Sequence, residues 1–247
     1  MNQIVDQIPF NKQVFNHFYV GIVITIFYVW ISPLVINAGM PGFSVLLIAE
    51  IGILLPLVVA HLWRSSKKYD TGINSIELIP YRKKISPKKF LLWTLAGLLG
   101  CIVIYIPLFP IGLYLRESIF GWLPEWYFNP TYGTENIDLI AKVFLAGILI
   151  DGFIGPVAEE IFFRGYLLPR MAYLKKWAPI VNGVMFGLYH FWQPHNLIAL
   201  IAIGILLSYV VWKTKNVYLG IAIHCTLNIL GGLGGYMAVM SGTMIGR

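Results

Sequence analysis

Long apolar stretches separated by short polar segments dominate the chain. A membrane-spanning helix needs about 20 mostly apolar residues, and several of these stretches meet or approach that length. They cover residues 18–35, 43–63, 90–115, 139–158, 178–191, 197–212 and 217–239. The pattern predicts an all-α fold: a polytopic membrane helix bundle of about seven transmembrane helices. Because these stretches use nearly the whole chain, we expect one integral membrane domain over residues 1–247.

The composition supports a membrane protein. Hydrophobic residues make up 58% of the 247 residues and charged residues only 12%, whereas a soluble domain carries about 25% charged residues. The formal net charge is +7, but a basic excess in a membrane protein usually marks cytoplasmic loops. No nucleic-acid-binding motif accompanies the charge, so we expect no nucleic-acid partner.

The basic residues are unevenly distributed, and this predicts the topology. Eight of them lie between the second and third apolar stretches: Arg64, Lys67, Lys68, Arg82, Lys83, Lys84, Lys88 and Lys89. Only Asp70 and Glu77 oppose them there. The positive-inside rule places this segment in the cytoplasm, and with it the N-terminus. In a bacterium the protein would lie in the plasma membrane.

The fourth apolar stretch has an irregular sequence. Gly155, Pro156 and Pro169 occur close to charged residues, which predicts a kinked fourth helix. Irregular backbone at membrane depth is tolerated where it is buried in protein or lines a cavity, so we expect an intramembrane cavity there. The fifth stretch, 178–191, is short for a full span and is expected to be tilted or to enter only part of the bilayer.

Three charges lie inside this apolar sequence, in the segment EEIFFR at residues 159–164. A charged side chain at the bilayer centre costs about 2.5–3.5 kcal/mol on insertion scales, and such residues are usually functional. Glu160 and Arg164 are four residues apart, so they can form an ion pair on one helix face. Glu159 then faces elsewhere and is a candidate general base. The alternative is a charge cluster at the membrane interface.

Two further polar pairs occur at a spacing of four residues: Phe186 with His190, and His224 with Asn228. A lone buried histidine often has only a packing role, and a membrane asparagine often only bonds a neighbouring helix. An acid, two imidazoles and an amide on separate spans nevertheless supply what attack by water on a peptide bond needs. The combination predicts a catalytic site.

The three motifs, EExxxR, FxxxH and HxxxN, occur in this order within residues 151–230. In this respect the chain resembles the CPBP family of CAAX proteases and bacteriocin-processing enzymes, also called Abi. The resemblance implies an intramembrane endopeptidase, in which Glu159 and His190 activate a water molecule. His224 and Asn228 would then hold the developing oxyanion, and Glu160, Arg164 and Phe186 would support the site.

The resemblance leaves the need for a metal open, since family members are often described as metalloproteases. Glu159, His190 and His224 are ligand types that bind zinc with an open fourth position. The amide of Asn228 suits zinc poorly. We favour catalysis that requires no cofactor, with zinc as the alternative.

The substrate class follows only from the resemblance: a prenylated CAAX protein, or a peptide such as a bacteriocin precursor, with the lipid bilayer as the other partner. Two alternatives are a non-enzymatic bacteriocin immunity or scaffold protein and a proton-coupled transporter. The complete motifs argue against the first alternative. The sequence has no evident internal repeat, which argues against the second.

Overall fold

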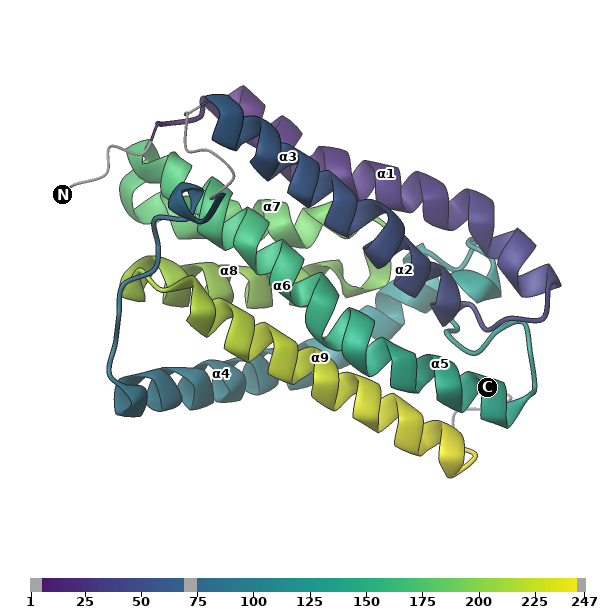
Figure 1. Cartoon of the computed structure of the whole chain (residues 1–247). Helices are drawn as coiled ribbons and strands as arrows, with labels where there is room; N and C mark the ends of the chain where they lie inside the picture. Colours follow the sequence, from purple (N-terminus) through teal and green to yellow (C-terminus); the bar gives the residue numbers. More distant parts are fainter. Residues whose placement is uncertain (1–5, 69–74, 244–247) are drawn as a thin grey trace.

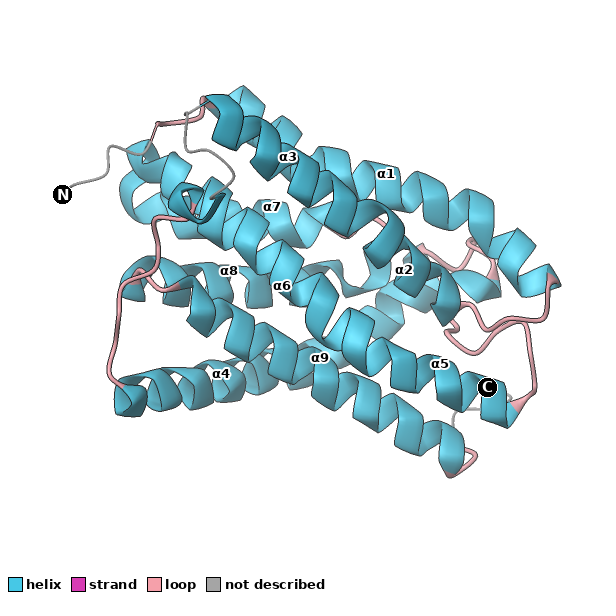
Figure 2. Ribbon diagram, in the orientation of Figure 1, coloured by secondary structure: helices cyan, strands magenta, loops and turns pink. Residues whose placement is uncertain are grey.

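The computed structural model describes residues 6–68 and 75–243. Over these residues the chain is almost entirely helical, and its one extended pairing is an isolated bridge between Arg82 and Asn216 (Figure 2). The predicted all-α bundle is confirmed. The predicted cytoplasmic N-terminus and part of the basic segment, residues 69–74, lie outside the described residues.

The main helical elements follow one another along the chain, with the longest connections between α3 and α4 and between η3 and α5. Their bounds are α1 (Phe10–Asn37), α2 (Phe43–Ala49), η1 (Glu50–Leu54), α3 (Leu55–Lys68), α4 (Pro87–Tyr114), η3 (Leu115–Ile119), α5 (Ile137–Leu149), η5 (Ile150–Ile154), α6 (Gly155–Glu159), η6 (Glu160–Leu167), η7 (Leu168–Trp177), α7 (Ala178–Tyr189), α8 (Leu197–Thr214) and α9 (Val217–Met240). Three short 3-10 turns complete the described elements: η2 (Ser75–Leu78), η4 (Glu125–Tyr127) and η8 (Pro194–Asn196).

Local sequence explains where several helices start. Ser86 caps α4 by accepting a hydrogen bond from the Lys89 backbone, and Pro87 occupies the first helical position, where its missing N–H is not needed. Asn136 and Asn216 cap α5 and α9 in the same way. These side chains satisfy N–H groups that the first helical turn leaves unpaired.

Within residues 6–68 and 75–243, five helical runs are long and apolar enough to cross a membrane: Phe10–Asn37, Phe43–Lys68, Pro87–Ile119, Pro194–Thr214 and Val217–Met240. They confirm an integral membrane protein. The other two predicted spans are not among these five. The helical path from α5 to η6 is divided by π-helical turns, and α7 has 12 residues. The total of seven spans therefore stays a prediction.

The fourth predicted helix is irregular, as expected. Its two π-helical segments, η5 and η6, flank the five-residue α6, and Figure 1 shows the path bending between α5 and α6. The predicted boundaries differ from the helix ends in places: α1 begins at Phe10 rather than at residue 18, and α7 ends at Tyr189, so His190 and Phe191 lie outside the helix. His190 has φ −81° and ψ 54°, which is not helical, and it directs the chain into the loop before α8.

The helices form a bundle with α1 and α3 on one flank and α4 on the other (Figure 1). Between them, α7 and α8 pack very closely, because Gly183 and Gly187 face the α8 backbone at Ile205 and Ile201. Small residues allow membrane helices to approach in this way. The close approach brings Gly204 and Ser208 of α8 next to the residues that follow α6.

Most of the basic residues lie at one end of the bundle, whereas Arg116 and Lys142 lie nearer the other end. At the basic end α3 and α8 finish and α4 and α9 begin (Figure 1). The opposite end carries the acidic residues Glu117, Glu125, Glu135 and Asp138. In the sequence-based topology the basic end faces the cytoplasm, and this orientation stays a prediction.

Candidate active site

The two glutamates lie at a junction between helix types in the middle of the bundle. Glu159 is the last residue of α6, and Glu160 is the first residue of the π-helical η6. Glu159 is 7% exposed and Glu160 is fully buried. Short π-helical turns inside α-helices occur often at functional sites, and here the turn begins between two adjacent carboxylates that make different contacts.

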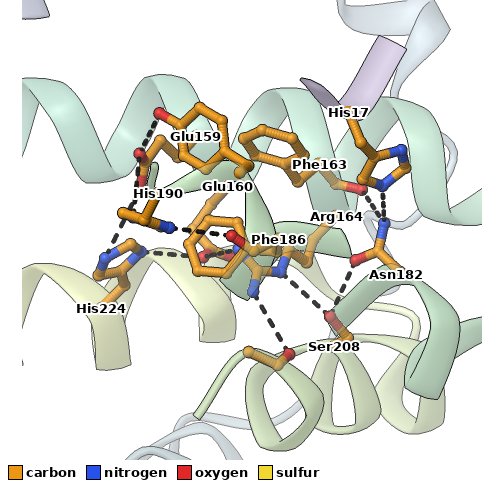
Figure 3. Close-up of polar contacts among 12 residues, drawn as sticks. His17, Glu159, Glu160, Phe163, Arg164, Asn182, Phe186, His190, Ser208 and His224 are labelled. Atoms are coloured by element: carbon orange, nitrogen blue, oxygen red, sulfur yellow. Dashed lines mark hydrogen bonds and ion pairs between the residues drawn. The ribbon is translucent and has the colours of Figure 1, made fainter. Parts of the chain in front are cut away.

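Glu159 is surrounded by one hydroxyl and two imidazoles (Figure 3). The Tyr189 hydroxyl donates to Glu159 Oε1 at 2.7 Å. His190 Nε2 lies 3.9 Å from the same oxygen. His224 Nε2 lies 3.8 Å from Glu159 Oε2. The structure thus brings together three of the four predicted catalytic residues, and it adds Tyr189, which the sequence analysis did not predict.

The second nitrogen of each imidazole is held by an oxygen that only accepts. His190 Nδ1 lies 2.9 Å from the Phe186 carbonyl oxygen. His224 Nδ1 lies 3.0 Å from Glu160 Oε1. A carbonyl or carboxylate accepts hydrogen bonds, so both Nδ1 atoms carry protons. In each neutral ring, Nε2 therefore presents a lone pair toward Glu159.

The predicted ion pair between Glu160 and Arg164 is present, with Arg164 Nη1 2.9 Å from Glu160 Oε1 and both side chains fully buried. Arg164 also donates to Ser208 Oγ at 3.2 Å and to the Gly204 carbonyl at 3.3 Å. Its guanidinium lies 3.7 Å from the centre of the Phe186 ring. The pair is thus fixed by several contacts, as a buried charge requires.

Phe186 contacts more of the site than its spacing from His190 predicted. Its ring meets the His190 ring edge-on, with 4.8 Å between the centroids. It also approaches the His224 ring at 6.0 Å. One aromatic side chain therefore packs against both imidazoles and against Arg164.

Asn228 differs from the other predicted catalytic residues in its hydrogen-bond partner. Its Nδ2 donates to the Asp151 carbonyl oxygen at 2.9 Å. Asp151 belongs to the π-helical η5, where widened turns alter the regular bonding of the backbone carbonyls. The amide group has a second N–H, and the side chain lines the same cavity as Glu159.

The predicted intramembrane cavity is present and has a volume of about 530 Å³. Glu159, His190, His224 and Asn228 all line it. Its other polar residues include Glu50 and Asp151 from the π-helical segments η1 and η5. Apolar side chains of α4 and α8 form much of the remaining wall: Ile102, Ile106, Ile203 and Leu207. The cavity thus combines a polar cluster with an apolar surface.

The same cluster has donors suited to zinc, but their spacing is wide. Zinc ligands at about 2.0–2.1 Å in a tetrahedron would lie roughly 3.3 Å from one another. The nitrogens of His190 and His224 lie 3.9 and 3.8 Å from the oxygens of Glu159. No group of three potential ligands close enough to hold a metal occurs within the described residues. Imidazoles whose Nδ1–H is held by an oxygen are nevertheless typical of metal ligands, so zinc stays the alternative.

Comparisons with known proteins agree with the motifs. Residues 141–230 match the family described as type II CAAX prenyl endopeptidase Rce1-like. The UPF0177 protein YxdF of Lactococcus lactis subsp. lactis (strain IL1403) is 24% identical over 97 residues, which are 39% of this chain and 51% of that protein. The chain therefore aligns with about half the length of this curated relative. No solved structure matches the chain significantly. All three motifs, from Glu159 to Asn228, lie inside the matched residues, so the resemblance of this chain to the CAAX protease family is confirmed.

Proposed function

We propose that the protein is an intramembrane endopeptidase of the CAAX type that cleaves a peptide bond with a water molecule activated by Glu159 and His190. The observation that carries the proposal is the position of Glu159. Its carboxylate lies between the Nε2 atoms of two histidines, at 3.9 and 3.8 Å, on the wall of a membrane-embedded cavity.

The geometry around Glu159 suits a bridging water. A distance of 3.9 Å between Glu159 Oε1 and His190 Nε2 is too long for a direct hydrogen bond, but a water about 2.8 Å from each atom would bond both. Both atoms are acceptors, so the water would direct one O–H to each of them. Its lone pair would then face the substrate carbonyl, and Glu159 would take the water proton during attack. Glu159 would return this proton to the amine nitrogen as the C–N bond breaks.

His224 and Asn228 are proposed to stabilise the oxyanion. Since His224 Nδ1–H already donates to Glu160, Nε2 can donate to an oxyanion only when the ring carries a second proton. Glu159 and Glu160, on either side of the ring, would balance that positive charge. Asn228 would contribute its free N–H. One such donor is worth about 2.7–4 kcal/mol of the reaction barrier.

We propose that this chemistry requires no metal. In this proposal the Glu160–Arg164 pair orients His224 through the shared carboxylate oxygen, Glu160 Oε1, so no metal is needed to hold the imidazole. If zinc were bound, Glu159, His190 and His224 would hold it. It would then act as a Lewis acid toward the peptide carbonyl.

The substrate class is proposed from the cavity and the family. Apolar side chains of α4 and α8 beside the polar cluster suit a prenylated or apolar peptide that enters from the cytoplasmic side of the bilayer. A bacteriocin-type peptide would use the same surface. Ile24 of α1 and Glu50 of η1 also line the cavity, so residues outside the matched family region take part. This supports one protease domain formed by the whole chain.

The test is cleavage of a defined substrate by the purified protein in detergent or liposomes. A farnesylated, fluorogenic CAAX peptide and the same peptide without the lipid would be compared. We expect cleavage by the wild type and none by Glu159→Gln, an isosteric change that removes the base. Glu117→Gln, an exposed residue at the acidic end, is the matched control and should remain active.

Two results would contradict the proposal. If Glu159→Gln cleaved the peptide as fast as the wild type, Glu159 would not be the base. If the folded wild type cleaved neither peptide, a non-enzymatic role would be favoured. Preference for the farnesylated peptide would identify the prenyl group as part of the recognised substrate.

A further inference from the structure

A chain of buried side-chain hydrogen bonds leads from the active site to α1 (Figure 3). Arg164 Nε donates to Ser208 Oγ at 3.2 Å. Ser208 Oγ donates to Asn182 Oδ1 at 2.8 Å. Asn182 Nδ2 lies 3.0 Å from His17 Nε2. All four residues are fully buried, so their polar atoms find partners in one another and in nearby backbone carbonyls rather than in solvent.

The surrounding backbone fixes the direction of these bonds. His17 Nδ1 lies 2.7 Å from the Gln13 carbonyl oxygen. A carbonyl only accepts, so Nδ1 carries the proton, and Nε2 of the neutral ring accepts. Asn182 must therefore turn its NH2 group toward His17, where it also donates to the Phe163 carbonyl at 3.1 Å. Its oxygen is then left to accept from Ser208.

The reversed arrangement is excluded by the same contacts. If the Asn182 amide were flipped, its oxygen would face the Phe163 carbonyl oxygen and the lone pair of His17. Ser208 would lose its acceptor, and the Asn182 NH2 group would face a hydroxyl oxygen that already accepts from Arg164. One orientation of Asn182 thus satisfies every group, and it leaves the Ser208 lone pair directed at Arg164.

At the other end, Arg164 determines how the reacting residues are held. Its Nη1 and His224 Nδ1 both bond Glu160 Oε1, at 2.9 and 3.0 Å. A rotation of the guanidinium would therefore move the carboxylate oxygen that receives the His224 proton. His224 Nε2, on the far side of that ring, would change its direction toward Glu159.

We propose that His17, Asn182 and Ser208 are positioning residues for the proposed peptidase reaction: they fix Arg164 and, through Glu160, the orientation of His224. The inference rests on the proposed function. Within the described part of the chain, the cavity lining includes none of these three residues, so they act without touching substrate. His17 belongs to α1, outside the family match at residues 141–230.

The competing explanation is that the chain of bonds only stabilises the fold. The two explanations differ in the activity of the molecules that do fold. A stabilising role lowers the folded fraction or the Tm and leaves the kcat of folded protein unchanged. A positioning role lowers kcat at unchanged KM, because His224 acts in the transition state and the substrate still binds the same cavity.

The experiment compares His17→Leu with His17→Gln, using kcat and KM per folded molecule together with Tm. Leucine removes the acceptor, whereas the glutamine oxygen can still accept from Asn182. We expect kcat to fall about tenfold in His17→Leu, the effect of one ordinary hydrogen bond on the barrier, with KM unchanged. His17→Gln should remain within about twofold of the wild type. Ser208→Ala interrupts the series of hydrogen bonds at a second point and should lower kcat as His17→Leu does.

Ser32→Ala is the matched control, because Ser32 is also fully buried on α1 and bonds the Tyr28 carbonyl at 2.6 Å, away from this chain of bonds. It should lower Tm with kcat unchanged. The positioning role is overturned if folded His17→Leu and Ser208→Ala both retain wild-type kcat, or if His17→Gln loses as much as His17→Leu.

A readout without substrate separates this inference from the proposed function. In protein with 15N-labelled histidine, the His224 Nδ1 resonance should report a protonated nitrogen and should shift in Ser208→Ala. If the wild type cleaves no substrate, the proposed peptidase function is refuted. The shift of the His224 Nδ1 resonance in Ser208→Ala would still test whether Ser208 positions His224. An unchanged His224 resonance in folded Ser208→Ala would refute the positioning alone.

Discussion

Replacement of Glu160 by alanine should destabilise the protein far more than the same change at Glu159. Glu160 and Arg164 are both fully buried and form an ion pair of 2.9 Å. Removal of one partner from a buried pair typically costs about 3–5 kcal/mol, because the remaining charge has no compensation. Glu160→Ala would also take the acceptor from His224 Nδ1. The result is expected to be poor accumulation as well as lost activity.

The loss of stability expected for Glu159→Ala is smaller. Glu159→Ala leaves the Tyr189 hydroxyl without its acceptor, which costs about 1–3 kcal/mol for a buried polar group. The change also removes a buried carboxylate, which offsets part of that cost. We therefore expect Glu159→Ala to fold and insert while its activity is abolished.

The assay is thermal unfolding of both variants in the same detergent, with accumulation in membranes measured in parallel. For a chain of this size about 1 kcal/mol corresponds to roughly 2–4 °C in Tm. Glu160→Ala should therefore unfold about 6–20 °C below the wild type. Glu160→Gln keeps an oxygen that accepts from Arg164 and should recover part of this loss. If Glu159→Ala were the unstable variant and Glu160→Ala folded normally, the assigned roles would be reversed.

Three further predictions concern the base, the metal and the topology. Tyr189→Phe removes the 2.7 Å hydrogen bond to Glu159 and should lower kcat about tenfold with the Tm little changed; equal kcat would make the hydroxyl irrelevant to the reaction. Exhaustive chelation should leave activity intact with less than stoichiometric zinc by elemental analysis, whereas activity that is lost and then restored by zinc would assign the histidines as ligands. Cysteines placed at the exposed positions Lys84 and Glu135, in a background without native cysteines, should respond differently to a membrane-impermeant reagent in intact cells. Protection at position 84 and labelling at position 135 are expected, and the opposite pattern would invert the topology.

The sequence predicted the features that depend on residues close together in a single helix. The apolar stretches gave the helices, because a membrane requires long apolar runs with internal hydrogen bonds. The ion pair between Glu160 and Arg164 followed from their spacing of four residues. The irregular backbone near Gly155 followed from glycine and proline inside an apolar stretch.

The remaining contacts join segments that lie far apart in the sequence. His224 bonds Glu160 across 64 residues, and Asn182 bonds His17 across 165. No local periodicity encodes such pairs. Tyr189 gave no signal, because a tyrosine at the end of an apolar helix is common in membrane proteins. A buried asparagine and histidine in apolar helices, such as Asn182 and His17, are the features that could have pointed to the network.

Three of the four π-helical segments in the described part of the chain, η1, η5 and η6, make the geometry of the site depend on the number of residues in its helices. Glu50, Asp151 and Glu160 each occupy the first or second position of one such segment, and a π-turn amounts to one residue more than an α-turn holds. Deletion of Gly152 from η5 would therefore make the helix more regular while it rotated Glu159 by about 100° relative to α5. In most helices an extra residue only interrupts the regular backbone hydrogen bonding. Here the extra residue determines the rotational position at which the Glu159 carboxylate faces the two histidines.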